Sequence, residues 1–401
     1  MPEEDVYGKG LQPLFLSWLK SMGLNRDPFA VLDAGQDPDI PAYLVDHADF
    51  EKMWGDWPAF VFAPAGGGKT AFRARLARAC RVGEDGRRIF PIVYRRLPAP
   101  DEITQDSHGQ SVHLKNVLRQ AAQELLFLSA YRALELNALD EGTLVALRRI
   151  LDENLPSPLD DYLTRLHHFG DLSLLANEFD RTASHLINPP GPQDVNRFCE
   201  RLAHIPASSS SEQSPEQRFE ELVQFVLGPL RFEAIYLLVD GVDAYPETRR
   251  DSNAAISVMQ WLLDNATEWA ARRIFVKFFL PVELDQVLSR QFPSLLTPPV
   301  KIAIIQWTAN DLVQVIRRRL GVASAGMFDS LDAISSPGLR GAEKTLARRA
   351  RPPVPREALV LTERLLVEHV QQSQGRGKLE PEDLEAVEEW YRIDRLAVSS
   401  P

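Results

Sequence analysis

The chain has 401 residues, a formal net charge of −11 and two cysteines, Cys80 and Cys199. The acidic balance argues against a protein that coats nucleic acid by bulk charge, and two cysteines exclude a disulfide framework. No apolar run approaches the roughly 18 residues that cross a bilayer, and the N-terminus lacks a secretory pattern. We therefore expect a cytoplasmic protein of two or three packed units that does not associate with membranes.

The first strong pattern is a short apolar run at 58–63, followed by three consecutive glycines, by Lys69 and Thr70, and by an amphipathic run that starts after Thr70. This order predicts a buried strand, a tight turn and a helix. A second strand is expected at 88–97. From about 110 to 228 the apolar periodicity is mainly helical, with joints at 188–192 and 206–215, the second of which we expect to be a flexible surface loop.

Strand patterns return at 233–240, 273–280 and 300–307, with helical patterns between them. Strands that alternate with helices predict a parallel sheet with crossover connections. Thr308 is expected to cap a helix that begins near Ala309, and the later helices are expected at 355–372 and 381–393.

We expect an α/β fold, with a three-layer α/β/α core around a parallel sheet. The expected parts are an N-terminal segment packing on a nucleotide site (1–57), the first part of the core (58–98), a helical insertion (99–228), the second part of the core (229–307) and a C-terminal helical lid (308–401). The insertion is expected to carry a partner surface or to cap the sheet.

The glycine-rich stretch APAGGGKT predicts a loop that binds phosphates, because backbone N–H groups and a helix N-terminus supply many donors in a small space. Lys69 would reach the β- and γ-phosphates, and the Thr70 hydroxyl would bind Mg²⁺. Ala63 replaces the first glycine of the usual motif, at a position that ends the strand. The expected nucleotide contacts are Pro64, Ala65, Gly66, Gly67, Gly68, Lys69, Thr70 and Ala71.

A carboxylate should accompany such a loop to hold the metal. Asp240 follows a buried strand and is the expected acid on the Mg²⁺ side. Asp243 lies three residues later and is the expected general base for an attacking water. The alternative for both is a surface turn after the strand, and Glu247 is an outside candidate.

An apolar strand ending in D-G-h-D, after an A-x-x-x-x-G-K-T loop, resembles the STAND class of P-loop NTPases, relatives of AAA+ proteins. The resemblance implies ATP and Mg²⁺ as cofactors and a nucleotide state that switches assembly. The class usually has a further acid where this chain has Ala244. That departure predicts slow hydrolysis rather than loss of binding.

The resemblance implies further site residues. The stretch 23–33 is similar to a segment that lies near the adenine, with Asn25, Pro28 and Phe29 as the residues to follow; an ordinary turn is the alternative. Arg290 would reach the γ-phosphate of a neighbouring subunit, or would only complement a helix dipole. Arg356, near the start of the lid helix, would contact the phosphates.

The resemblance also implies a polar sensor near the end of the strand at 273–280. Leu280 stands at the usual position, so Lys277 is a substitute candidate, with snorkelling to a sheet edge as the alternative. We expect an ATP-binding, slowly hydrolysing switch that forms homo-oligomers and acts on a separately encoded protein partner.

Three alternatives stay open. A DNA-associated regulator of the origin or transposition type would use the basic stretch 340–356, although nucleic acid is not the favoured partner. A small-molecule kinase would use the same loop with an acceptor pocket. A protein that keeps nucleotide as a structural ligand would not turn it over.

Overall fold

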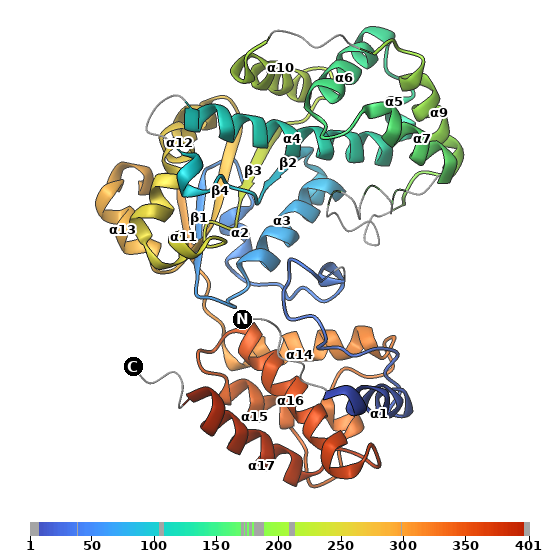
Figure 1. Ribbon diagram of the computed structural model, residues 1–401, viewed down its shortest axis with the longest axis vertical. Helices are drawn as coiled ribbons and strands as arrows, with labels where there is room; N and C mark the ends of the chain where they lie inside the picture. The colour runs from blue at the N-terminus through green and yellow to red at the C-terminus, as the bar shows by residue number, and fades with distance from the viewer. Residues whose placement is uncertain are drawn as a thin grey trace. The chain divides into compact units, whose positions relative to one another are not determined.

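The computed structural model describes residues 8–37, 39–103, 108–169, 172, 175, 179, 188–207, 213–297 and 299–396. The chain forms two compact units, which we call the sheet unit (Ala48–Phe62 and Phe72–Ile304) and the helical unit (Met1–His47, Ala63–Ala71 and Ile305–Pro401). Figure 1 labels their elements. Within the described ranges, no helix combines the length and apolarity that a membrane span requires.

The sheet unit is built on a five-stranded parallel sheet with the strand order β2-β3-β4-β1-β5. The strands are β1 (Ala59–Ala63), β2 (Ile89–Tyr94), β3 (Ala234–Val239), β4 (Ile274–Pro281) and β5 (Lys301–Ile304). Every residue of β1, β2 and β3 is buried, which is the pattern of strands covered on both faces. The α/β fold and the five strands expected from the sequence are confirmed.

β5 is shorter than the predicted strand at 300–307. It pairs only with β1, in a register that runs from Ala59 opposite Lys301 to Phe62 opposite Ile304. Along this edge strand Lys301 and Ile304 are exposed and Ala303 is buried.

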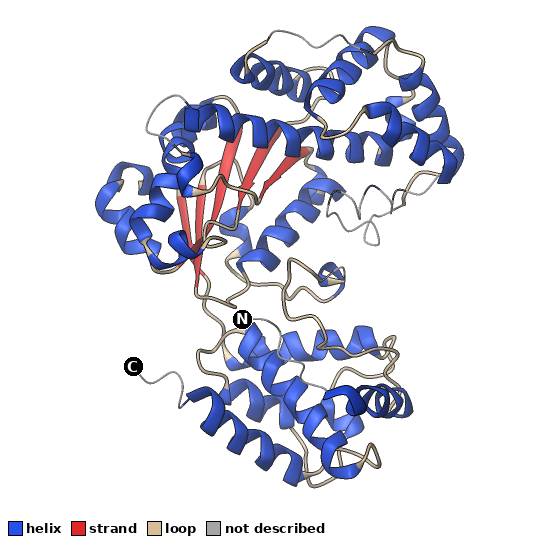
Figure 2. Cartoon of the chain, in the orientation of Figure 1, coloured by secondary structure: helices blue, strands red, loops and turns tan. Residues whose placement is uncertain are grey.

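Helices pack on this sheet, with α4 against β2, α10 against β3 and α12 against β4, an arrangement compatible with a three-layer α/β/α fold (Figure 2). The helices that lie wholly or mostly in the sheet unit are α2 (Phe50–Met53), α3 (Lys69–Val82), α4 (His108–Tyr131), α5 (Ala133–Leu136), α6 (Glu141–Asn154), α7 (Leu159–Phe169), α9 (Pro192–Ala203), α10 (Pro215–Leu227), α11 (Pro246–Arg250), α12 (Ser252–Ala271) and α13 (Leu284–Gln291).

The helices between β2 and β3 share one apolar core with the sheet. Leu118 and Leu125 of α4 are buried in the same cluster as Phe90 of β2 and Leu237 of β3. Local sequence sets the helix starts: Ser214 and Gln217 form a capping box at α10, and Pro215 occupies its first turn. The predicted loop at 206–215 lies partly outside the described residues, and α10 already begins at its last position.

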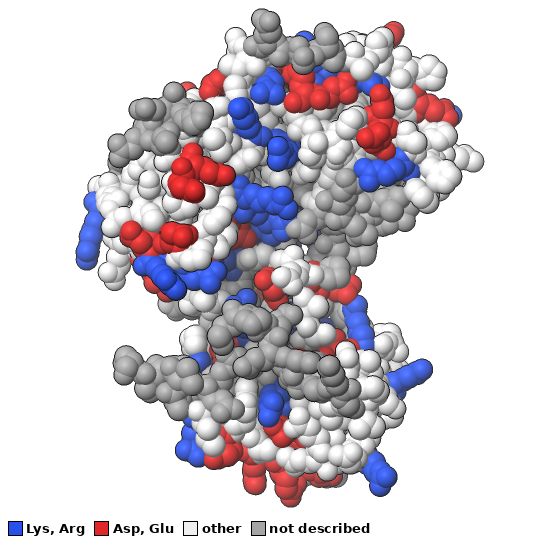
Figure 3. All heavy atoms as spheres, in the orientation of Figure 1, with Lys and Arg blue, Asp and Glu red and all other residues white. Residues whose placement is uncertain are grey.

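The helical unit contains α1 (Gly8–Ser21), α14 (Ala309–Ala323), α15 (Ala342–Arg349), α16 (Pro355–Ser373) and α17 (Pro381–Trp390). It has its own core, which includes Trp18, Phe29 and Leu365. Acidic side chains gather over α17 on the face shown in Figure 3.

The predicted start of α14 is confirmed. Thr308 Oγ1 accepts the N–H of Asp311 at 3.2 Å, and Asp311 Oδ2 accepts the N–H of Thr308 at 2.9 Å. This reciprocal pair satisfies two of the donors that a helix N-terminus leaves open.

Candidate functional site

The glycine-rich loop, residues 63–70, joins the end of β1 to the start of α3. The N–H of Gly67 donates to the carbonyl of Pro64 at 2.9 Å, which closes a tight turn. Gly66 and Gly68 have φ of 74° and 92°, a region that side chains other than glycine adopt at a cost. α3 begins at Lys69, so the first N–H groups of a 14-residue helix follow the turn directly.

The sheet topology also marks the end of β1. The chain leaves β1 for the edge strand β2, returns through β3 to β4, and finishes at β5 on the other side of β1. The connection after β1 therefore runs toward one edge of the sheet, and the connection after its neighbour β4 runs toward the other, which is a reversal between these two strands. In open α/β sheets, ligands bind beyond the carboxyl ends of strands at such a reversal.

Lys69 is 8% exposed, and its Nζ lies 3.3 Å from the carbonyl oxygen of Ala63. Its ammonium group is therefore held over its own loop. Thr70 is half-buried in the first turn of α3, and its Cγ2 lies 3.6 Å from the place where a side chain on Gly35 would begin. The N-terminal segment thus reaches the loop within the helical unit.

The first turn of α16 lies directly on the loop. The N–H of Arg356 is 3.4 Å from the carbonyl oxygen of Gly66. A Cβ atom added to Gly66 would lie 2.7 Å from Cβ of Arg356, so only glycine permits this approach. The indole N–H of Trp307 donates to the Gly67 carbonyl at 2.9 Å. The structure therefore brings Arg356 and the glycines together and adds Trp307 and Gly35, while the contact of Arg356 with phosphates stays a prediction.

Asp240 lies at the carboxyl end of β3 and is 5% exposed. Its Oδ1 accepts the N–H of Gly241 at 2.8 Å, and its Oδ2 accepts Nε of Arg73 at 2.9 Å. Both side chains of this ion pair are 7% exposed. Arg73 was not among the predicted site residues, although its spacing of three residues from Thr70 puts both on one face of α3.

The other predicted groups of the sheet unit lie in more open surroundings. Asp243 is half-buried, and its backbone carbonyl accepts Nε of Arg249 at 3.1 Å. Arg290 is exposed in the last turn of α13, and Glu247 and Ala244 are exposed after β3. The roles assigned to these residues stay predictions.

The segment predicted to lie near an adenine packs on α14. The N–H of Asn25 donates to the carbonyl of Ala323 at 2.8 Å, and Nη1 of Arg319 donates to the carbonyl of Pro28 at 3.1 Å. Phe29 is fully buried in the core of the helical unit. Any role of these residues toward a base therefore stays a prediction, while their packing role is plain.

Lys277 is not at a sheet edge, so the snorkelling alternative is wrong. It lies in the interior strand β4 with no exposed surface, and its Nζ donates to the carbonyls of Gly55 at 2.8 Å and Trp57 at 2.6 Å. Those residues precede β1, whereas the glycine-rich loop follows it. Burial lowers the pKa of Lys277 to about 7, because the low-dielectric interior disfavours its charged form.

The chain matches no family model, no curated protein and no solved structure. The described residues also contain no cluster of three or more His, Cys, Asp or Glu side chains of the kind that holds a metal ion. The site therefore rests on the glycine-rich loop and the groups packed on it.

Proposed function

We propose that this chain binds ATP at the glycine-rich loop and uses the bound nucleotide as a switch. The observation that carries the proposal is the docking of the first turn of α16 on Gly66, with Arg356 at the contact. A helix that rests on a phosphate-binding turn is placed to respond to what the turn holds. This proposal includes the fold assignment to the P-loop NTPases, of the STAND type.

The phosphates would be held by this chain's own donors. The N–H groups of the loop and the N-terminus of α3 favour negative charge. Lys69 adds an ammonium group, and Arg356 is exposed beside Gly66 and adds a guanidinium group. Charge-assisted hydrogen bonds of this kind contribute about 1.5–3 kcal/mol each.

Mg²⁺ is the expected companion of the nucleotide and would neutralise phosphate charge. The Thr70 hydroxyl is a fitting donor to it. Asp240 fits less well, because its Oδ2 accepts Nε of Arg73 and its Oδ1 accepts the N–H of Gly241. A carboxylate neutralised by a buried guanidinium attracts a cation weakly. No step is therefore assigned to a metal at Asp240.

Slow turnover fits this proposal better than fast turnover. Asp243 would orient a water molecule as general base, and Arg290 of a neighbouring copy would stabilise charge on the γ-phosphate. Ala244 stands where the resembled class has a further acid. Binding of the nucleotide is thus better supported than its hydrolysis. A change in the position of α16 would be the structural response of the switch to the bound nucleotide.

The test is the affinity of the full-length chain for a fluorescent ATP analogue. We expect Lys69→Ala to weaken binding by roughly 10–100-fold, because it removes one charge-assisted contact. Lys344→Ala changes an exposed lysine on α15 of the same unit and serves as the matched control. Equal affinity of Lys69→Ala and the wild type, or no binding by the wild type, would refute the proposal.

The same samples test the switch. Molecular mass in solution is measured for the chain alone, with ADP and with a non-hydrolysable ATP analogue. We expect the mass to depend on the nucleotide in the wild type and not in Lys69→Ala. If the wild type binds the analogue but its molecular mass does not change, the binding site stands and assembly is excluded as the response to nucleotide.

A further inference from the structure

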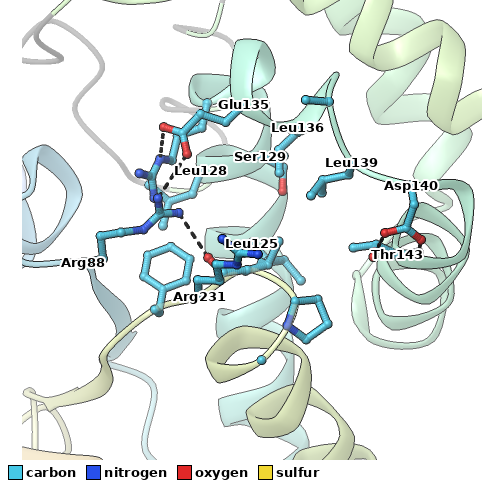
Figure 4. Close-up of a pocket in the computed structure, with 16 residues that line it drawn as sticks. Arg88, Leu125, Leu128, Ser129, Glu135, Leu136, Leu139, Asp140, Thr143 and Arg231 are labelled. Atoms are coloured by element: carbon cyan, nitrogen blue, oxygen red, sulfur yellow. Dashed lines mark hydrogen bonds and ion pairs between the residues drawn. The ribbon is translucent and has the colours of Figure 1, made fainter.

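A cavity of about 650 Å³ lies in the sheet unit, beside α4, α5, the start of α6 and the loop that precedes β3. Figure 4 shows the residues that line it. Its volume is in the range of sites that hold small organic ligands, which is roughly 300–1,000 Å³. None of the residues assigned to the nucleotide lines it.

Part of the cavity wall is apolar. Leu125 and Leu128 of α4 are 1% and 4% exposed, and Phe232, just before β3, is 6% exposed. Leu136 and Leu139 continue this wall beyond α4. A ligand with an apolar body would lose contact with water here, which is favourable by about 25 cal/mol per Å² of buried apolar surface.

Two guanidinium groups share one carboxylate at one side of the cavity. Nη1 of Arg88 and Nε of Arg132 lie 3.3 Å and 3.1 Å from oxygens of Glu135. Both guanidinium groups lie over the ring of Phe232, at 5.7 Å and 5.6 Å from its centroid. Burial lowers the pKa of Arg132, and the charge of Arg88 adds to that lowering. The side chains therefore hold more positive than negative charge in one place.

The other charged groups of the cavity leave this excess of positive charge unchanged. Arg231 also lines it. Asp140 lies on the other side of the cavity from Arg88, and its carboxylate turns toward Thr143 and caps α6 by accepting the N–H and the hydroxyl of that residue at 2.9 Å and 2.8 Å. The lining thus has three arginines against two carboxylates, one of which is engaged in a helix cap.

We propose that this cavity binds a small monocarboxylate with an apolar body. The carboxylate would meet Arg88 and Arg132, and the hydroxyl of Ser129, which points into the cavity, would donate to it (Figure 4). A singly charged group matches the excess of one positive charge. A phosphate dianion would bring more charge to a leucine-lined wall than the arginines neutralise, at a large desolvation cost.

Glu135 pairs with the same two arginines that would bind the ligand carboxylate. Its carboxylate holds the two arginines as a ligand carboxylate would, and its side chain is 52% exposed. A ligand therefore competes with Glu135 for the same donors. Removing the charge of Glu135 should strengthen binding, whereas removing either arginine should weaken it. This inference does not rest on the binding of nucleotide.

The experiment is a fluorescence titration of the full-length chain with dansylaminoundecanoic acid, with its neutral methyl ester as the comparison probe. We expect one molecule of the acid to bind per chain. The ester, Arg88→Met and Arg132→Met should each weaken binding by about 10-fold or more, the value of one charge-assisted hydrogen bond. Glu135→Gln should tighten binding severalfold.

Arg165→Met is the matched control, because Arg165 also lies over an aromatic ring, that of Tyr162, but outside the cavity. We expect it to bind the acid as the wild type does. Unfolding curves of every variant show which ones remain folded. The proposal is overturned if the wild type does not bind the acid, if the ester binds equally well, if both arginine variants bind normally, or if a folded Glu135→Gln binds more weakly.

Discussion

Arg73 and Asp240 join the first turns of α3 to the end of β3 inside the sheet unit. Both side chains are 7% exposed, so neither charge has water to stabilise it if its partner is removed. A buried pair of this kind contributes little net free energy compared with apolar residues, yet breaking it is costly. The pair therefore fixes where α3 lies on β3 whether or not a nucleotide is present.

We expect Arg73→Met to lower the free energy of unfolding of the sheet unit by about 3–5 kcal/mol, because it removes the guanidinium group that is paired with the buried Asp240 carboxylate. The double variant Arg73→Met, Asp240→Asn should recover part of that loss. Urea unfolding measures both. Arg149→Met, which breaks a partly exposed pair with Glu221 in the same unit, should cost about 1 kcal/mol or less. If Arg73→Met also lowers the free energy of unfolding by only about 1 kcal/mol, the argument from a buried ion pair is wrong.

Sequence alone could assign the types of these residues but not their pairing. Asp240 is recognisable because it ends an apolar strand, and Lys69 because it follows three glycines. Arg73 sits in a helix that carries several arginines, and only the packing of α3 on β3 selects it. The surroundings of Lys277 were not predictable for a related reason, since a lone charge in an apolar strand does not reveal that backbone carbonyls will accept its hydrogen bonds.

The contact between α16 and the glycine-rich loop belongs to the scale of elements. The stem of Arg356 occupies the space in which a side chain at position 66 would lie. Gly66→Ala therefore combines two costs, the positive φ of 74° and the collision with Arg356. The first raises the free energy of the folded state by about 1–2 kcal/mol at any such position, and the second acts on α16 alone.

We expect Gly66→Ala to speed amide hydrogen exchange in the first turn of α16, because that turn must move away from the loop. Gly341→Ala is the matched control. Gly341 has the same φ of 74° in the same unit, but nothing lies within 4 Å of a Cβ atom added there. It should leave exchange in α16 unchanged. Equal exchange in the two variants would show that the contact does not hold α16.

The elements themselves were largely predictable because their signals are local. The five strands are apolar runs between turn residues, and the capping pair Thr308 and Asp311 indicates the start of α14. The early end of β5 was not predictable, since the apolar run continues to Trp307 whereas the pairing with β1 stops at Ile304. α15 lies in the segment expected to be a helical lid, but its own bounds were not predicted, because that stretch was interpreted by its charge.

At the scale of the whole molecule, the residues that the structure describes form two apolar cores, one in each unit. The sequence predicted more parts than two, because motifs mark segments along the chain whereas packing groups them in space. The glycine-rich loop illustrates this, since it is continuous with β1 yet belongs by its contacts to the helical unit. Two cores make it reasonable to expect two unfolding transitions, each of which responds to its own buried groups.

Lys277 provides a way to assign those transitions. Burial lowers its pKa from 10.5 to about 7 in the folded protein, so between these values the unfolded chain binds more protons than the folded one. The stability of the sheet unit should therefore gain from Lys277 as pH rises from about 7 toward 10, by a few kcal/mol in total, since each pKa unit is worth about 1.4 kcal/mol. Lys277→Met should remove that gain.

Calorimetry of the wild type and Lys277→Met from pH 6 to 9 measures this difference. We expect the stability of the wild type to rise relative to that of the variant as pH increases. This change should appear in one transition only, that of the sheet unit. The carbonyls of Gly55 and Trp57 lose a donor in the variant, but that cost does not vary with pH and leaves the slope unaffected. A difference that is constant across this range would mean that Lys277 stays charged inside the sheet unit, held by those carbonyls and by the ring of Tyr236 at 4.5 Å.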